Sequence, residues 1–380
     1  MTEDWENGGF GIYIHWPFCT AKCPYCDFNS HVRSNINQKQ WLKAYLNEIK
    51  RVSEKTSNRI LNSVFFGGGT PSLIEPSIIG DVLNEIQKHW KTKNNFEVTL
   101  EANPGSVDAK NFKAYKEAGV NRTSMGIQSL NTKDLKALGR THTVEEALAA
   151  FEIARQNFKA VSFDLIYARQ NQNINQWEKE LSLALSLEAS HMSLYQLTIE
   201  QGTAFGDRYN RGLLKGLPND DTSADMYDLT LSLCEDRGLV SYEVSNYAHQ
   251  GYESIHNLIY WRYGDYIGIG PGAHGRLTID GKKYATETVL SPEAWLKKVE
   301  CDGSGESNSV VLTDQQQAAE FVMMGLRLKE GINYQRFKNL SGSAFSKTKL
   351  NFLKDLNLIE EKNGYIATTN SGRKVLNSVL

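Results

Sequence analysis

The sequence has no long apolar segment, little net charge and few cysteines, and each shortage narrows the class of protein. No apolar run among the 380 residues is long enough to cross a bilayer, so we expect no transmembrane segment. The net charge of −2 gives no global electrostatic reason to expect nucleic acid or an anionic membrane surface as a partner. The acidic start MTEDWENGGFG lacks the basic and apolar regions of a signal peptide, which predicts a cytoplasmic protein with reduced thiols.

The sequence has five cysteines, and an odd number does not indicate a disulfide framework. Three of them, Cys19, Cys23 and Cys26, follow the spacing C-x3-C-x2-C, and the other two stand far apart. Such a tight group of thiols in a reducing compartment indicates a metal site. Three thiolates suit an iron–sulfur cubane with one iron left open to another ligand. A zinc site completed by His31 is the alternative.

The first two hundred residues alternate between short β-rich runs and longer amphipathic stretches. Such alternation predicts a parallel sheet with right-handed crossovers, either a doubly wound open sheet or an incomplete barrel. Periodicity does not choose between them, but both place the active site at the carboxyl ends of the strands. The predicted strands are 11–15, 63–66, 97–100, 122–126, 161–166 and 192–197, and the predicted helices are 38–55, 76–90, 108–118, 131–138, 144–157 and 175–187.

Unusual residues gather just beyond the predicted strand ends. The cysteines follow the first strand, glycines 67–69 the second and Glu101 the third. Gln128 follows the fourth strand, and Asp164 lies near the end of the fifth. Because the carboxyl ends of parallel strands share one edge, this placement predicts a single site built by several loops.

The last third of the chain predicts a second, smaller unit. The Ser/Gly stretch 302–309 reads as a linker, which divides the chain into a barrel domain at 1–305 and a C-terminal domain at 306–380. A helix near 343–356 and a hairpin over 358–367 with a turn at Asn363–Gly364 indicate a winged-helix-like domain. Residues 341–380 hold six basic and three acidic side chains, an excess of +3 without a dense patch. We therefore expect this domain to cover the barrel opening or dock a partner, and not to bind nucleic acid.

Several ordered motifs together resemble the oxygen-independent coproporphyrinogen oxidase family of radical S-adenosylmethionine (SAM) proteins. The resemblance implies an α/β fold with a partial (β/α)6 barrel, a [4Fe–4S] cluster on the three clustered cysteines, and SAM bound beside it. The motifs are YIHWPFC (13–19), CPYCDF (23–28), FGGGTPS (66–72), EANP (101–104), MGIQS (125–129), FDLIY (163–167) and IGIGPGAHG (267–275).

The same resemblance implies a set of SAM contacts. Three of these residues also have a purely structural interpretation. Glu101 could cap a local turn, Gln128 could satisfy backbone groups, and Arg140 could be a solvated charge at a helix end. The implied contacts are Tyr13 and Tyr25 at the cluster mouth, Gly68, Gly69 and Thr70 at the methionine end, Glu101 on the ribose hydroxyls, and Gln128, Arg140 and Asp164 elsewhere, with Arg140 pairing with the SAM carboxylate.

Two features place the resemblance nearer to the HemW-type haem chaperones than to the oxidases. Phe28 stands where the oxidases carry a further cysteine, and residues 256–261 match the HNxxYW motif of the chaperone branch. The resemblance implies that the chain binds haem and passes it to acceptor proteins. A haem iron needs an axial ligand such as histidine, and His256 has motif support, while His249 and His274 are weaker candidates. The alternative is that His256 is a hydrogen-bonded loop residue beside packed aromatic side chains.

The reaction stays open at this point. One alternative is an oxidase that decarboxylates coproporphyrinogen III through a deoxyadenosyl radical and needs an electron donor. Another is a radical SAM enzyme for an unrelated substrate. Residues 168–170 read Ala-Arg-Gln where the family has Gly-Leu-Pro. Because glycine and proline shape the backbone, the loop after the fifth strand is expected to differ.

Overall fold

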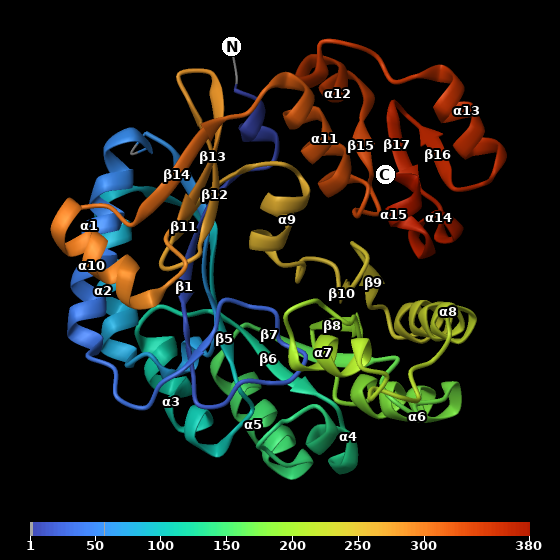
Figure 1. The fold of residues 1–380 in the computed structure, drawn as a ribbon, viewed down its shortest axis with the longest axis horizontal. Coiled ribbons are helices and arrows are strands. Elements are labelled where there is room, and N and C mark those ends of the chain that lie inside the picture. The colour runs from blue at the N-terminus through green and yellow to red at the C-terminus, as the bar shows by residue number, and fades with distance from the viewer. Residues whose placement is uncertain (1–2, 57) are drawn as a thin grey trace.

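The computed structural model, which describes residues 3–56 and 58–380, is built around one sheet of twelve strands (Figure 1). The strand order is β14-β13-β12-β11-β1-β4-β5-β6-β7-β8-β10-β9, and the run from β11 to β8 is parallel. Figure 1 shows this sheet bending through the molecule, so it forms an incomplete barrel and not a flat open sheet. The parallel strands are β1 Phe10–Trp16, β4 Ile60–Gly68, β5 Lys91–Ala102, β6 Arg122–Gln128, β7 Ala160–Tyr167, β8 His191–Gln196 and β11 Asp265–Ile269.

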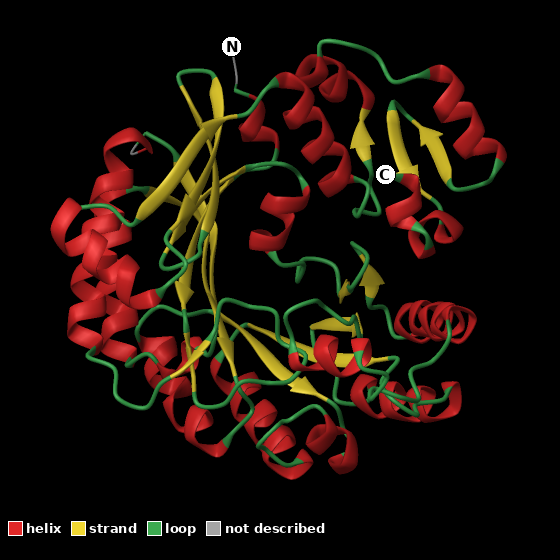
Figure 2. Cartoon of the chain, in the orientation of Figure 1, coloured by secondary structure: helices red, strands yellow, loops and turns green. Residues whose placement is uncertain are grey.

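Helices cover the outer, convex face of the barrel (Figure 2). The first of them buries Trp41, Tyr45 and Ile49 against the sheet because these residues recur at helical spacing. Each such large apolar side chain contributes roughly 1.5–3 kcal/mol when fully buried. The helices after β1 and β4 to β7 are α1 Gln38–Thr56, α2 Pro76–His89, α3 Ser106–Glu117, α4 Thr132–Ala137, α5 Val144–Asn157 and α6 Ile174–Leu185.

Antiparallel strands extend the sheet at both edges. The stretch 302–309, expected to be a linker, instead contains the end of one helix and the start of β14, which pairs with β13. The division of the chain near residue 305 stays a prediction. The edge strands are β9 Val240–Ser241, β10 Asn246–Ala248, β12 His274–Ile279, β13 Lys282–Thr288 and β14 Glu306–Val311, and the helices in this part are α7 Ala204–Asn210, α8 Asp220–Asp236, α9 Ile255–Trp261 and α10 Pro292–Asp302.

The C-terminal part has a small sheet and a hydrophobic core of its own. Tyr263, which belongs to the barrel part of the chain, also packs into this core. Asn363 and Gly364 both have positive φ, which makes the tight hairpin turn that the sequence predicts. The helix-then-hairpin arrangement is confirmed. Its elements are α11 Asp314–Gly325, β15 Ile332–Asn333, α12 Tyr334–Ser341, α13 Lys347–Asp355, β16 Ile359–Lys362, β17 Tyr365–Thr368, α14 Asn370–Lys374 and α15 Leu376–Val379.

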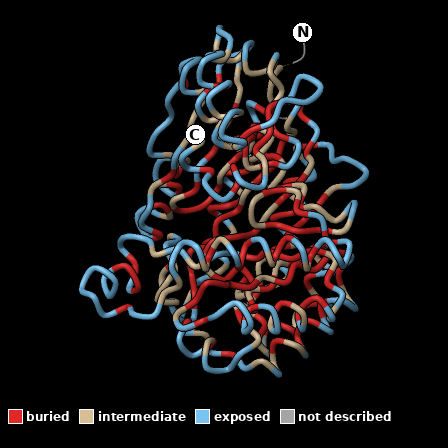
Figure 3. Tube along the Cα trace, turned by 90° about the vertical axis from the view of Figure 1, so that its right-hand side faces the viewer, coloured by how far each residue is buried: buried red, intermediate tan, exposed pale blue. Residues whose placement is uncertain are grey.

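Charged side chains hold this C-terminal part against the barrel. Arg336 pairs with Asp4 at 2.8 Å and also donates to the carbonyl of Arg262. Figure 3 shows the buried residues gathered in the interior of the molecule and the exposed ones around its rim. None of the helices in the described residues is long and apolar enough to cross a membrane.

Candidate functional site

Beyond the carboxyl end of β1, Cys19 ends the short strand β2 (Phe18–Cys19), and Cys23 and Cys26 follow on the loop that leads to β3 (His31–Val32). Cys19 is buried, whereas Cys23 and Cys26 are partly exposed. Burial raises the pKa of the Cys19 thiol, the Thr70 hydroxyl lowers it, and the nearby Cys26 and Cys23 raise it further. Within residues 3–56 and 58–380, no three His, Cys, Asp or Glu side chains lie close enough together to hold a metal ion as they stand. The loop therefore brings the thiols into one neighbourhood without fixing them as a tetrahedral set.

Arg140 ties the cysteine loop to the ends of two strands. Its Nη1 donates to Cys23 Sγ at 3.3 Å, and its Nη2 donates to Asn103 Oδ1 at 2.7 Å and to the Gly126 carbonyl at 2.9 Å. Its Nε is buried and has no partner among the described residues. Arg140 is thus no solvated helix-end charge. It is a largely buried cation beside a cysteine, with one donor still unused.

The glycine loop after β4 lies against the same region. Gly68 has a φ of 112°, and a Cβ there would lie 2.5 Å from His15 Cε1. A Cβ on Gly69 would lie 2.6 Å from the Phe18 carbonyl oxygen. Both contacts are shorter than atoms tolerate, so only glycine lets this loop approach β1 and the cysteine loop. The Gly68 N–H donates to Glu101 Oε2 at 3.1 Å.

Two carboxylates face the mouth of the barrel from β5 and β7. Burial raises the pKa of Glu101 to about 8; the Gly68 N–H lowers that pKa and the charge of Asp164 raises it. Asp164 accepts from Ser124 Oγ at 2.7 Å and Ser162 Oγ at 2.8 Å, and burial raises its pKa. Glu101 therefore remains mostly protonated at neutral pH while the site holds no cation.

Gln128 and Tyr25 complete the expected set. Gln128 has a φ of 71°, uncommon for a residue other than glycine, and its buried Oε1 has no partner among the described residues. Tyr25 lies beside Arg140 and Cys23, and burial raises the pKa of its hydroxyl. Thr70 Oγ1 accepts from Asn103 at 3.3 Å. The structure thus brings the predicted residues from five strand ends to one place.

Tyr13 and His15 on β1 connect the barrel interior to the cysteine loop. His15 Nε2 lies 2.9 Å from the Asn29 carbonyl oxygen, so this nitrogen carries the hydrogen and donates. Nδ1 of the same ring therefore accepts from the Tyr13 hydroxyl at 3.0 Å. Burial lowers the pKa of His15, which keeps the ring neutral and this chain of hydrogen bonds intact. Tyr13 also stacks on Phe65, with ring centroids 6.2 Å apart.

His256 occupies the core of the barrel and not an open face. Its side chain is 1% exposed. Nδ1 lies 2.8 Å from Ser63 Oγ, and Nε2 lies 2.7 Å from the Tyr260 hydroxyl. Burial lowers the pKa of this imidazole to about 3, so the ring is neutral. The hydrogen-bonded alternative describes the ring, because both ring nitrogens already have partners, but His256 lies in α9 and not in a loop.

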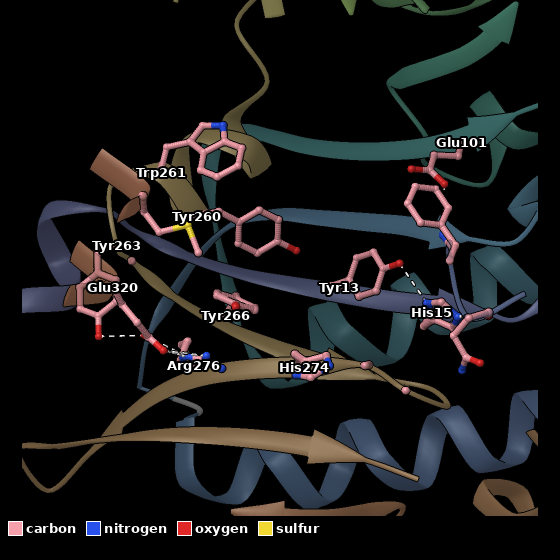
Figure 4. Close-up of a pocket in the computed structure, with 17 residues that line it drawn as sticks. Tyr13, His15, Glu101, Tyr260, Trp261, Tyr263, Tyr266, His274, Arg276 and Glu320 are labelled. Carbon is pink, nitrogen blue, oxygen red and sulfur yellow. Dashed lines mark hydrogen bonds and ion pairs between the residues drawn. The ribbon is translucent and has the colours of Figure 1, made fainter. Parts of the chain in front are cut away.

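A cavity of about 400 Å³ opens between the barrel mouth and the C-terminal part (Figure 4). This volume falls within the roughly 300–1,000 Å³ of typical small-molecule pockets. Its lining joins the cysteine loop, the barrel strands, α9, β12 and α11, and is rich in aromatic rings. The lining includes Tyr13, Phe28, Glu101, Tyr260, Trp261, Tyr263, Tyr266, His274, Arg276, Glu320 and Met324.

In the loop after β7, alanine stands where the family has glycine, but the backbone has the left-handed conformation that glycine favours. Ala168 has a φ of 55° and is buried. Arg169 reaches inward and pairs with Asp134 at 2.7 Å and with Glu180. Gln170 donates to the Lys215 carbonyl at 2.7 Å. The departure from the family pattern thus places a buried arginine in an ion-pair cluster beside this loop.

Several cavity residues have no local signal in the sequence. The HNxxYW motif identified Tyr260 and Trp261, but Tyr266, Arg276 and Glu320 stand in no motif that sequence reasoning singled out. Tyr266 and Arg276 pair across β11 and β12, and Glu320 joins them from the C-terminal part. Only the tertiary fold brings these residues together.

Comparison with known proteins bears directly on this site. Residues 13–184 match the model of the radical SAM superfamily, and residues 312–375 match that of the HemN C-terminal domain. The chain is 38% identical to the protein named heme chaperone HemW of Haemophilus influenzae, over 97% of this chain and 96% of that protein. It is also 38% identical to radical S-adenosyl methionine domain-containing protein 1, mitochondrial, of Danio rerio, over 88% of this chain and 76% of that protein.

The fold has a close counterpart among solved structures. Coproporphyrinogen III oxidase (HemN) from Escherichia coli superposes with a TM-score of 0.81, covering 98% of this chain and 89% of that one, at 19% sequence identity. That likeness establishes the shared radical SAM fold. The whole-length sequence match is closer to the proteins named HemW. The chain therefore belongs to the HemW family of the radical SAM superfamily.

Proposed function

We propose that this chain is a haem chaperone that holds a [4Fe–4S] cluster and SAM at the barrel mouth and passes haem to an acceptor protein. Relatives named heme chaperone HemW match it at 33–38% identity, three of them over 97% of its length. The observation that carries the proposal is the aromatic cavity, which extends from Gly68 and Glu101 to α11. A cavity of this size and lining suits a flat, largely apolar ligand beside the cofactor site.

The cysteine loop fits an iron–sulfur cluster through the chemistry of its donors. Cys19, Cys23 and Cys26 would supply three thiolates, the soft ligands that such clusters prefer. The guanidinium of Arg140 donates to Cys23 Sγ at 3.3 Å, so a cation already lies beside this member of the cysteine set. A cluster held by these cysteines would supply one-electron chemistry toward a bound SAM.

The neighbouring residues fit SAM because they present unused groups and a backbone cradle. Gln128 Oε1 and Arg140 Nε are buried and lack partners in the part of the chain that the structure describes. We assign Arg140 to the carboxylate of SAM and Glu101 to its ribose hydroxyls. We assign Gly68, Gly69 and Thr70 to the methionine end, and Gln128, Asp164, Tyr13 and Tyr25 to the remaining contacts.

Oxidative decarboxylation of coproporphyrinogen III is the competing function. The barrel shared with HemN favours it, since the same mouth is available for radical chemistry. Phe28 argues against it: its side chain is 56% exposed and lines the cavity at the position where the oxidases carry another cysteine. Location in the cytoplasm and the existence of a haem-acceptor protein stay predictions.

The test is haem loading followed by transfer. The full chain is reconstituted anaerobically with iron and sulfide, given haem and freed of excess by gel filtration. We expect one haem per chain, with a Soret band that decays as apomyoglobin, the probe acceptor, gains its own spectrum. Bovine albumin saturated with haem serves as the control for passive exchange. A chain that takes up no haem, or never releases it, contradicts the proposal.

A further inference from the structure

His274 differs from the other histidines in the surroundings of its ring. The chain has eight histidines, all within the described residues, and His274 is the one whose ring nitrogens make no hydrogen bond there. Its side chain is 60% exposed and lines the cavity from β12. The nearest carboxylate, Glu287 on the adjoining strand, places Oε1 3.8 Å from Nδ1. His274 therefore presents an imidazole nitrogen that is available to a ligand in the cavity.

The other two histidines near the cavity are not available in this way. His15 lines it, but donates to the Asn29 carbonyl through one nitrogen and accepts from Tyr13 through the other. His256 lies behind Tyr260 with both nitrogens engaged. Ligation of iron by either ring would first require breaking hydrogen bonds in a buried place, which is costly.

Arg276 lies two residues beyond His274, on the same face of β12. Its guanidinium holds the Glu320 carboxylate of α11 through Nε at 3.0 Å and Nη2 at 2.8 Å. This two-point contact is the geometry by which arginine recognises carboxylates in general. Both side chains are largely buried, so an incoming carboxylate of a ligand would meet a desolvated, well-oriented cation. Figure 4 shows Arg276 and His274 along one edge of the cavity, opposite Tyr13 and Tyr260.

We propose that the cavity is the haem site, with His274 as the iron ligand and Arg276 as the anchor of a haem propionate in place of Glu320. This inference rests on the proposed function and names its binding site. Tyr260, Trp261 and Tyr266 provide apolar walls for the macrocycle. Displacement of Glu320 couples haem binding to the contact between the barrel and the C-terminal part, because that carboxylate belongs to α11.

Two neighbouring residues act as positioning residues. We assign Glu287 the role of orienting His274: its Oε1 lies 3.8 Å from Nδ1, beyond hydrogen-bond distance, and ligation of iron through Nε2 would leave the Nδ1 hydrogen on the Glu287 side. His256 fixes the hydroxyl of Tyr260, which lines the cavity wall. The histidine of the HNxxYW motif thus supports the wall, and its removal should weaken binding without removing the iron ligand.

The experiment titrates the reconstituted full chain with haem, iron-free protoporphyrin IX and haem dimethyl ester. It follows the Soret band and the electron paramagnetic resonance of ferric haem. The variants are H274A, H256A and R276A, with H249A as the matched control, because His249 bonds to the Gly238 carbonyl outside the cavity. Circular dichroism and thermal unfolding check that each variant folds.

We expect H274A to lose the histidine-ligated ferric spectrum and about tenfold or more in haem affinity, with protoporphyrin IX affinity unchanged. R276A should weaken haem binding but leave binding of the dimethyl ester unchanged, and H249A should match the unsubstituted chain. A wild-type spectrum in H274A overturns the assignment, as does loss of histidine ligation in a folded H256A alone. If the unsubstituted chain binds no haem at all, the proposed function itself has failed.

Discussion

Replacing Glu101 by Gln is expected to stabilise the ligand-free protein at alkaline pH while weakening its binding of SAM. In the folded chain, burial holds the pKa of Glu101 near 8, against 4.5 for an ordinary glutamate. Between pH 4.5 and 8 the folded state therefore binds more protons at this site than the unfolded state. Stability must fall as pH rises through that window, because the unfolded carboxyl ionises freely and the folded one does not.

The size of the effect follows from the two pKa values. Each pKa unit corresponds to about 1.4 kcal/mol, so the full change would amount to about 5 kcal/mol. Glu101 lines a cavity open to water, and solvent screening reduces this to about 2 kcal/mol. The Gln side chain keeps the shape, still accepts from the Gly68 N–H and never ionises. Loss of a charged acceptor for the ribose hydroxyls should lower SAM affinity about tenfold to hundredfold.

The assay compares denaturant unfolding of both proteins, free of ligand, from pH 5 to pH 9. The difference between the two curves isolates residue 101 from every other titrating group. We expect E101Q to gain about 2 kcal/mol relative to the unsubstituted chain across this range. Calorimetric titration with SAM at pH 7 supplies the second readout. Parallel stability profiles, or equal SAM affinity, would refute the reasoning from Glu101.

Three further substitutions test other parts of the account. C23S should abolish the visible absorbance and the paramagnetic resonance signal of the reconstituted cluster, whereas C301S, at an exposed cysteine, should leave both unchanged. R169M should cost about 3 kcal/mol in denaturant unfolding, because it leaves the buried Glu180 carboxylate without its cation. A168G should gain about 0.5–1 kcal/mol by the same measurement, since relief of the positive φ outweighs the extra chain entropy of glycine.

Retention of a full cluster by C23S would remove that cysteine from the ligand set. Unchanged stability of R169M would show that the ion-pair cluster contributes nothing to the fold. A loss of stability in A168G would mean that the left-handed backbone at residue 168 carries no strain.

The parts of the fold that follow local patterns were predictable. The six predicted parallel strands are present, with ends within a few residues, apart from β5, which begins earlier, at Lys91. The cysteine spacing and the glycine loop were recognisable because the groups that each needs lie close together in the sequence. The position of Glu101 and Gln128 at strand ends followed from the rule that parallel strands share one active edge.

The remaining features depend on contacts between distant segments. Nothing local to His256 shows that Ser63, 193 residues away, occupies one of its ring nitrogens. Arg276 meets Glu320 only because α11 packs against α9, far from β12 in the sequence. Likewise, β14 joins the sheet although its sequence reads as a linker. Choosing between an open sheet and a barrel likewise required the curvature of the whole sheet, which periodicity does not report.

The most direct test of the central claim supplies the reconstituted chain with SAM, a reductant and coproporphyrinogen III under anaerobic conditions, with haem loading measured on the same preparation. The account predicts stoichiometric haem uptake and no protoporphyrinogen by chromatography, while a true oxidase assayed in parallel turns over. Catalytic formation of protoporphyrinogen by this chain would contradict it and make the barrel mouth a decarboxylating active site.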